Sequence, residues 1–258
     1  MKSLIRWTVT LGLTGTTILS SLLTGTLQAL ALTQAQIIEK LQTVPVFAIA
    51  DAQGSLVTVS VPTQDNKTVS VAGFFISQQA AQSFINQRLK RDNPQLGNTA
   101  QVAVLSIADV YKLQQENKNK PNPVDFVFVP EDDEVKTAVD LLRQKGENVQ
   151  QFDQVPLFYA SAGQDSGYLT TELSGQQVIP FFFDKNQLQG LVDRYKQQQP
   201  NQSSTVQINV VTLEGLIETW ESKDDPALGK IVLWPTPESI EILQKISSSS
   251  QQSGGNNR

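Results

Sequence analysis

Clusters of carboxylates are the only residues of this chain whose types and spacing suggest catalysis or metal binding. Glu214, Glu218 and Glu221 are spaced i, i+4 and i+7, so one helix face would carry all three, and paired carboxylates can act as general acid and base. The run Glu131 to Glu134 could attract a cation. It lies, however, in the expected first turn of a helix, where the macrodipole stabilises negative charge, and it lacks the glycine turn of a calcium loop. Both groups are interpreted as solvated helix surface.

The chain contains no cysteine and no histidine, and this excludes several classes of enzyme. It has no thiol nucleophile, no disulfide, no zinc site built on these residues and no histidine-dependent triad. Any remaining catalysis would have to use carboxylates, Lys, Ser, Thr or Tyr. No glycine-rich phosphate loop is present either, so we expect no cofactor, no metal and no catalytic residue.

The first 31 residues have the pattern of a secretory signal peptide. Lys2 and Arg6 form a basic region, an apolar stretch follows as far as about Leu27, and Ala29-Leu30-Ala31 is a small-x-small cleavage site. The alternative is a membrane anchor, but the stretch is rich in Thr, Ser and Gly, whereas a stable span needs about 20 strongly apolar residues. We expect cleavage after Ala31 and export to the periplasm.

The exported chain is acidic. Removal of Lys2 and Arg6 with the signal peptide lowers the net charge from −5 to −7. Nucleic acids bind largely to Lys and Arg that neutralise phosphates, and anionic lipid surfaces attract basic segments. We therefore expect no nucleic-acid partner, and a protein that is peripheral to membranes at most.

Three apolar segments recur in the same order about a hundred residues apart, which is the pattern of an internal duplication. The pairs are 44–47 and 155–158, 74–77 and 181–184, and 126–130 and 231–235. Their spacing of 111, 107 and 105 residues drifts slowly, as short loop insertions would produce. Hydrophobic periodicity predicts the order β-β-β-α-β-α-β-α in each copy. The predicted fold is α+β, with two tandem repeats in a two-lobed, pseudo-symmetric body.

The predicted boundaries follow from these repeats. Repeat 1, with a short leading helix, takes residues 32–150, and repeat 2 takes residues 151–246. Residues 247–258 contain only Ser, Gln, Gly, Asn and one Arg, and we predict a disordered tail.

Two local predictions concern repeat 1. Residues 44–50 and 55–61 alternate as strands on either side of a turn sequence, which predicts a hairpin. Residues 78–90 are predicted to form one helix, with Ser77 as its N-cap.

Consecutive aromatic residues make the strands at 73–76 and 179–183 apolar on both faces. Either each strand is buried between two layers, or one face is left open as an apolar groove that binds another protein. The residues alone leave both interpretations open.

The order of these segments resembles that of the Tic22-like family, named after a component of the chloroplast inner-envelope protein-import translocon. The matching segments are 44–54, 73–77, 126–130, 155–158 and 179–182. No single motif is specific, but their order across both repeats is. The bacterial-type signal peptide indicates a cyanobacterial member.

The resemblance implies a soluble, non-enzymatic, chaperone-like factor that acts between membranes in protein translocation and outer-membrane protein biogenesis. Its partners would be unfolded or translocating client proteins and an Omp85-type outer-membrane protein, and a thylakoid pool would accompany the periplasmic one. Client segments would lie in apolar grooves near Phe47, Phe75, Phe158 and Phe182. The alternatives are a protein that binds a small apolar ligand in a cleft between the lobes and, third, the carboxylate-dependent hydrolase.

Overall fold

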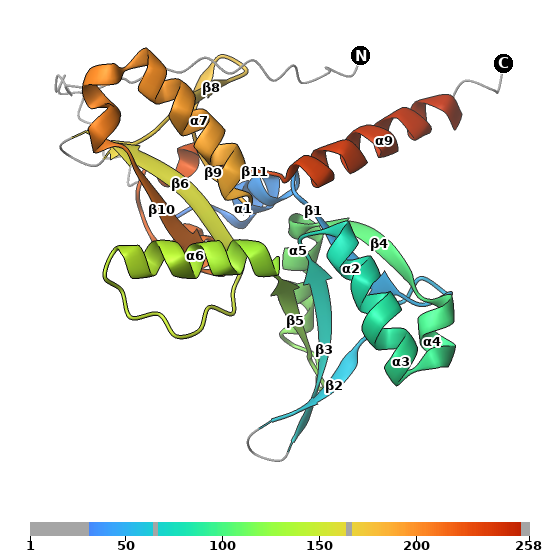
Figure 1. Cartoon of the computed structure of the whole chain (residues 1–258). Coiled ribbons are helices and arrows are strands. Elements are labelled where there is room, and N and C mark those ends of the chain that lie inside the picture. The colour runs from blue at the N-terminus through green and yellow to red at the C-terminus, as the bar shows by residue number, and fades with distance from the viewer. Residues whose placement is uncertain (1–30, 64–66, 164–166, 254–258) are drawn as a thin grey trace. The chain divides into compact units, whose positions relative to one another are not determined.

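The computed structural model describes residues 31–63, 67–163 and 167–253, which form two compact units (Figure 1). Unit A consists of residues 38–156 and the C-terminal segment from 235, and unit B of residues 31–37 and 157–234. The predicted signal peptide lies outside the described residues, except for Ala31. In the described part of the chain, no helix is both long and apolar enough to cross a membrane.

Unit A is built on a five-stranded sheet. β1 (Pro45–Ala50) is buried along its whole length and pairs antiparallel with β3 (Thr68–Phe75) and β4 (Gln101–Ser106). β2 (Val59–Pro62) pairs antiparallel with β3, and β5 (Val124–Val129) pairs parallel with it. A parallel pair needs a crossover connection, which the chain makes through β4 and the helix that follows it.

Polar caps begin the helices of unit A. Ser77 accepts a hydrogen bond from the backbone N–H of Ala80 at the start of α2 (Gln78–Phe84), as predicted. Ser106 and Asp109 form a capping box at the start of α5 (Ile107–Asn117). The acidic run opens α6 (Asp132–Gln144), where negative charge meets the positive end of the helix dipole.

The predicted hairpin is wrong beyond its turn. The turn forms, because the Asp51 carboxylate accepts hydrogen bonds from the backbone N–H groups of Gln53 and Ser55. After the bridge between Ala50 and Leu56, however, the returning chain leaves β1 and continues as β2 along β3. β1 already pairs with β3 on that edge, so the edge is not free for a longer hairpin.

The predicted helix over residues 78–90 is present, but it is not α-helical throughout. α2 passes into a π-helix, η1 (Ile85–Leu89), and then into α3 (Lys90–Asp92). Asn93 begins a further helix, α4 (Pro94–Thr99), because its side chain accepts a hydrogen bond from the N–H of Leu96 and Pro94 suits the first helical position.

Unit B is built on a six-stranded sheet with the order β10-β6-β9-β11. Its strands are β6 (Pro156–Ala162), β7 (Gly167–Tyr168), β8 (Thr171–Leu173), β9 (Gln176–Phe182), β10 (Gln207–Thr212) and β11 (Ile231–Trp234). β6 and β9 pair antiparallel, and β11 runs parallel to β9. The helical segments are α7 (Lys185–Gln198), η2 (Pro200–Thr205), α8 (Leu213–Ser222) and η3 (Leu228–Lys230).

The segments at the two ends of the described chain belong to the unit that is more distant in the sequence. α1 (Gln34–Leu41) spans the division between the units, and the N–H of Leu32 before it donates to the carbonyl of Trp220 in unit B. α9 (Pro237–Ser253) belongs to unit A, although the sequence placed residues up to 246 in repeat 2. The helix also continues into the segment that we predicted to be disordered. Residues 254–258 lie outside the described part.

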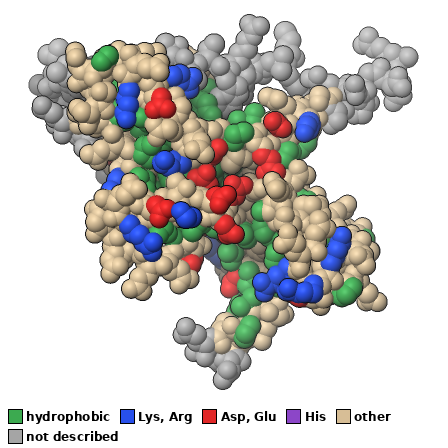
Figure 2. Space-filling model, in the orientation of Figure 1, with side chains coloured by type: hydrophobic (Ala, Val, Ile, Leu, Met, Phe, Trp, Pro, Cys, Tyr) green, Lys and Arg blue, Asp and Glu red, His purple; other side chains and the backbone are tan. Residues whose placement is uncertain are grey.

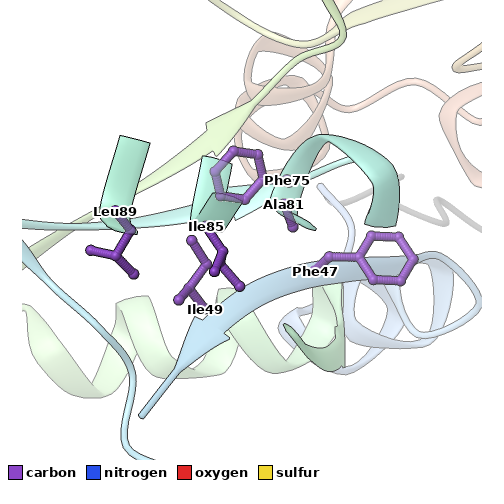
Figure 3. Packing of buried hydrophobic residues seen from close by; sticks show 6 residues of the cluster. All are labelled: Phe47, Ile49, Phe75, Ala81, Ile85 and Leu89. Atoms are coloured by element: carbon purple, nitrogen blue, oxygen red, sulfur yellow. The ribbon is translucent and has the colours of Figure 1, made fainter. Parts of the chain in front are cut away.

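The core of unit A explains why α9 belongs there. Its central cluster consists of Phe47, Ile49, Phe75, Ala81, Ile85 and Leu89 (Figure 3). Ile242 of α9 packs against this cluster. The carboxylate of Glu238 accepts hydrogen bonds of 3.1 Å from the backbone N–H groups of Gln78 and Gln79, at the start of α2.

Candidate functional site

The four predicted phenylalanines form two cross-strand pairs, one in each sheet. Phe47 on β1 pairs with Phe75 on β3, and Phe158 on β6 pairs with Phe182 on β9. All four are buried, with exposed fractions of 0% for Phe47 and Phe158, 6% for Phe75 and 4% for Phe182. Phe75 and Phe182 nevertheless each line a pocket, whereas Phe47 and Phe158 lie behind them in the core.

The pocket in unit A, which we name the α2 pocket, has a volume of about 810 Å³ and is open to solvent. Its apolar lining consists of Phe75, Ala80, Phe84, Val129 and Pro130, and its charged lining of Arg88, Arg91, Glu131, Asp132 and Asp133. Phe75 and Val129 are the last residues of β3 and β5. Because these strands are parallel, both end at the same edge of the sheet, which is where open α/β sheets commonly bind ligands.

The charges of the α2 pocket are separated by sign. Arg88 and Arg91 lie on the helical wall, where Asp92 makes ion pairs of 3.6 Å and 2.9 Å with their Nε atoms. The hydrogen bond from Arg91 holds the pKa of the Asp92 carboxyl below its usual value. Three acidic residues lie on the wall where α6 begins. Figure 2 shows acidic side chains gathered where α6 begins and basic ones over α3. A bound segment would therefore be oriented by its own charges.

The pocket in unit B, the α7 pocket, is smaller, at about 260 Å³. Phe182, Leu191 and Trp234 form its apolar lining, and the ring centroids of Phe182 and Trp234 lie 5.4 Å apart. Its polar lining consists of Thr171, Gln187 and Arg194.

The two pockets are lined by corresponding residues of the chain. Four pairs of lining residues lie 107 residues apart: Phe75 and Phe182, Ala80 and Gln187, Phe84 and Leu191, and Gln87 and Arg194. Val129 and Trp234, which end the parallel strands β5 and β11, lie 105 residues apart. Each pocket thus combines the last residue of a central strand, one face of the next helix and the last residue of the parallel neighbour.

A third cavity, the α8 pocket, lies on another surface of unit B and has a volume of about 470 Å³. Tyr159 stacks on Phe181 with ring centroids 4.7 Å apart, and Tyr168 lies beside both rings. Burial, together with the neighbouring Tyr168, raises the pKa of the Tyr159 phenol. This pocket is lined mainly by apolar and hydroxyl groups of the sheet and of α8.

Of the carboxylates singled out in the sequence, Glu214, Glu218 and Glu221 line none of these three pockets, and Glu131, Asp132 and Asp133 line the α2 pocket at exposed or partly exposed positions. Glu218 and Glu221 are exposed on α8, and no Asp or Glu is buried among the described residues. Nor do those residues contain a group of three His, Cys, Asp or Glu side chains that could hold a metal ion. The geometry thus offers binding pockets, and it gives the carboxylate-dependent hydrolase no support.

A model of the Tic22-like family matches residues 14–248. The chain belongs to the Tic22-like family. Its structure is similar to that of Tic22 from Anabaena, a protein of protein transport, with a TM-score of 0.73 and 33% identity over 83% of this chain and 97% of that one. Tic22 from Plasmodium falciparum shares the fold, with a TM-score of 0.61 and 20% identity over 83% of this chain and 98% of that one.

A curated Tic22-like relative agrees with this assignment. Protein TIC 22-like, chloroplastic, from Arabidopsis thaliana is 26% identical over 161 residues, which are 62% of this chain. The chain spans about half the length of that relative, 47%. The resemblance inferred from the sequence is confirmed, and so is the α+β class.

Sequence reasoning missed most of the polar lining of both Tic22-like pockets. Gln87 and Arg88 lie in the π-helix η1, and π-helical turns occur frequently at functional sites, but no residue pattern marked this one. Trp234 and Leu191 could have been found, because they match Val129 and Phe84 at the spacing of the repeats. Thr171 carried no such signal.

Proposed function

We propose that this protein is a soluble, chaperone-like factor in protein translocation and outer-membrane protein biogenesis, and that it holds apolar residues of client segments in the α2 and α7 pockets. The observation that carries the proposal is the occurrence of two pockets at corresponding positions, each with a phenylalanine from the predicted set among its apolar lining residues. Phe47 and Phe158 support these pockets from the core.

The size of the pockets suits weak, reversible holding. Full burial of one large apolar side chain contributes about 1.5–3 kcal/mol, which gives little affinity once the loss of freedom on binding is subtracted. Two linked sites on one chain raise the overall affinity without a tight contact at either. A client held in this way can be released to a later partner without ATP.

We also propose that the units arose by tandem duplication into a pseudo-symmetric body, as the repeats predict. The corresponding strand pairs support this. Phe47 pairs with Phe75 as Phe158 pairs with Phe182, and in both sheets the strand at the end of the β-α-β-α-β run pairs parallel with the central one.

Cleavage after Ala31, export to the periplasm, a thylakoid pool and an Omp85-type partner belong to the same proposal. They are supported by the signal-peptide pattern of the sequence and by membership of the Tic22-like family. Crosslinking in intact cells, followed by identification of the captured partners, tests this part.

An aggregation assay tests client holding. We expect the purified chain from Leu32 to slow the aggregation of a chemically denatured client. The substitution Phe84→Ser, at a partly buried position of the α2 pocket, should reduce protection at least twofold, because it removes apolar lining. The control is Val127→Ser, which removes an exposed apolar residue that lies outside the pocket lining. A wild-type chain that gives no protection would remove the main support for the proposal.

The alternative function, binding of a small apolar ligand, is favoured by the α8 pocket. Its volume of about 470 Å³ falls within the range of roughly 300–1,000 Å³ typical of small-molecule sites. Native mass spectrometry of the purified chain checks this alternative, which requires a co-purified apolar molecule that is lost when Leu216→Trp fills the pocket.

A further inference from the structure

The α7 pocket holds two polar atoms that the fold itself leaves without a partner. Oγ1 of Thr171 and Oε1 of Gln187 are buried, and neither has a hydrogen-bond partner among the residues that the structure describes. Both residues line this pocket, and Thr171 is only 2% exposed. Buried polar atoms are nearly always paired, because an unmade hydrogen bond leaves the desolvation penalty uncompensated. The two atoms therefore indicate a ligand that supplies the missing partners.

The chemistry of these groups restricts the ligand. A carboxamide oxygen only accepts, so the ligand must bring an N–H or O–H donor to Gln187. The hydroxyl of Thr171 can donate or accept, and Arg194 at the exposed rim can only donate. The Nε of Arg194 already donates to the carbonyl of Gly190 at 3.1 Å, which leaves the other guanidinium nitrogens for the ligand. The ligand must therefore carry a donor, and an acceptor on it could also be bound by Thr171 or Arg194; a peptide group has one of each.

The volume of the α7 pocket restricts the ligand further. A cavity of about 260 Å³ holds about nine waters at roughly 30 Å³ each and lies below the usual size of small-molecule sites. Its apolar lining, Phe182, Leu191 and Trp234, suits a single large apolar side chain. The dimensions and the polar atoms together fit one residue of a polypeptide chain.

We propose that the α7 pocket binds one large apolar residue of an extended polypeptide. The main-chain N–H of that residue donates to Oε1 of Gln187, and the hydroxyl of Thr171 forms a hydrogen bond with an adjoining polar group of the same polypeptide. This rests on the client-holding function and assigns main-chain recognition to unit B. The corresponding residue of the α2 pocket is Ala80, whose side chain forms no hydrogen bond. The two units thus recognise different features of a client.

Two labelled probe peptides test this proposal: Ac-Ser-Gly-Ser-Phe-Ser-Gly-Ser-NH2, and the same peptide methylated at the main-chain nitrogen of Phe. The binding of each to the purified chain from Leu32 is measured by fluorescence anisotropy. Methylation removes the donor, and we expect it to weaken binding about tenfold, the effect of one hydrogen bond. Gln187→Leu should weaken binding of the unmethylated peptide and abolish the difference between the peptides. Thr171→Val should weaken binding of both. Gln197→Leu, at an exposed position of the same helix, should leave binding unchanged.

Three outcomes of the peptide titrations would overturn the proposal: equal binding of the two peptides by the wild type, an undiminished methylation effect in Gln187→Leu, or no binding of either peptide. In each case the aggregation assay reports separately on client holding. If the protein still protects its client, the proposed client holding stands and only the proposed main-chain recognition is overturned. Tighter binding of 3-phenylpropanol than of the peptide would assign the pocket to a small alcohol and would also overturn the proposal.

Discussion

Ala80 and Gln187 occupy corresponding positions in two similar pockets, and they differ in the interactions that they can make. The caps before them correspond as well. Ser77 accepts a hydrogen bond from the N–H of Ala80, and Asp184 accepts one of 2.7 Å from the N–H of Asn186. Both caps could be predicted because their residue types favour the position. Which residues line a pocket could not be predicted in the same way, because this depends on which strand ends lie beside the helix.

Thr171→Val should stabilise the protein by about 1 kcal/mol. The substitution removes a buried hydroxyl without a partner, whose desolvation costs about 1–3 kcal/mol, and valine suits the strand β8. Thr219→Val is the matched control, because its hydroxyl donates to the carbonyl of Gly215 at 2.7 Å, and its loss should cost about 0.5–1.5 kcal/mol. Urea unfolding measures both, and a destabilised Thr171→Val would contradict the unpartnered state of that hydroxyl.

Asp109→Asn should destabilise the protein in a manner that depends on pH. The carboxylate accepts hydrogen bonds from the hydroxyl and the backbone N–H of Ser106, and these, with Lys112 nearby, lower the pKa of Asp109. A carboxyl with a lowered folded-state pKa stabilises the fold above its unfolded pKa of about 3.9, and this contribution is lost as the pH falls through the folded value.

The difference between wild type and Asp109→Asn should therefore be about 0.5–1 kcal/mol at pH 7 and shrink below about pH 4. Urea unfolding at a series of pH values measures it, with the exposed Asp125→Asn on β5 as control. A difference that is constant down to pH 3 would show that the charge of Asp109 has no role in the cap.

At the scale of elements, predictions succeeded where one local signal decided the outcome. The sequence predicts a helix over residues 185–198 and a strand over residues 231–234, and α7 (Lys185–Gln198) and β11 (Ile231–Trp234) have these bounds. For α7, a cap, an apolar period and a breaker agree. Predictions failed where the pairing of a strand depends on a partner that is distant in the sequence. β2 pairs with β3 because β1 is already occupied on that edge. The sequence also predicts one strand over residues 168–173, but this segment divides into β7, which pairs with β6, and β8, which pairs with β9.

Gly97→Ala should destabilise the helical wall of the α2 pocket. A Cβ at Gly97 would lie 2.5 Å from the Cα of Lys90, so α3 and α4 would have to separate; overpacking of this kind costs about 1–3 kcal/mol. Gly190→Ala in α7, where a Cβ meets nothing within 4 Å, should instead stabilise by about 0.5–1 kcal/mol. Thermal unfolding distinguishes the two, and equal effects would contradict the close approach at Gly97.

At the scale of the molecule, the two units are each assembled from separate parts of the sequence. The repeats in the sequence predict a duplication, but they do not predict that the terminal segments belong to the other unit, because α9 has the same amphipathic pattern whichever sheet it covers. Its place in unit A is fixed by Ile242 and Glu238.

A chain that ends at Trp234 should lose stability in unit A and keep unit B. Its unit A lacks the packing of Ile242 on the core and the two hydrogen bonds to Glu238. Hydrogen exchange measured by mass spectrometry should show faster exchange in α2 and β1, with α7 and β9 unchanged. Glu241→Ala in the full chain, at an exposed position of α9, is the control. Equal loss of protection in both units would contradict the assignment of α9.

The position of α9 also sets an order of events in time. A chain that leaves the ribosome or crosses a membrane from its N-terminus presents all of unit B before the helix that completes unit A. Until its last segment has passed, the cluster around Phe47 lacks one of its packing partners and the start of α2 lacks Glu238. The strands of unit A thus precede unit B along the chain, but the packing around them is completed only after α9 has followed.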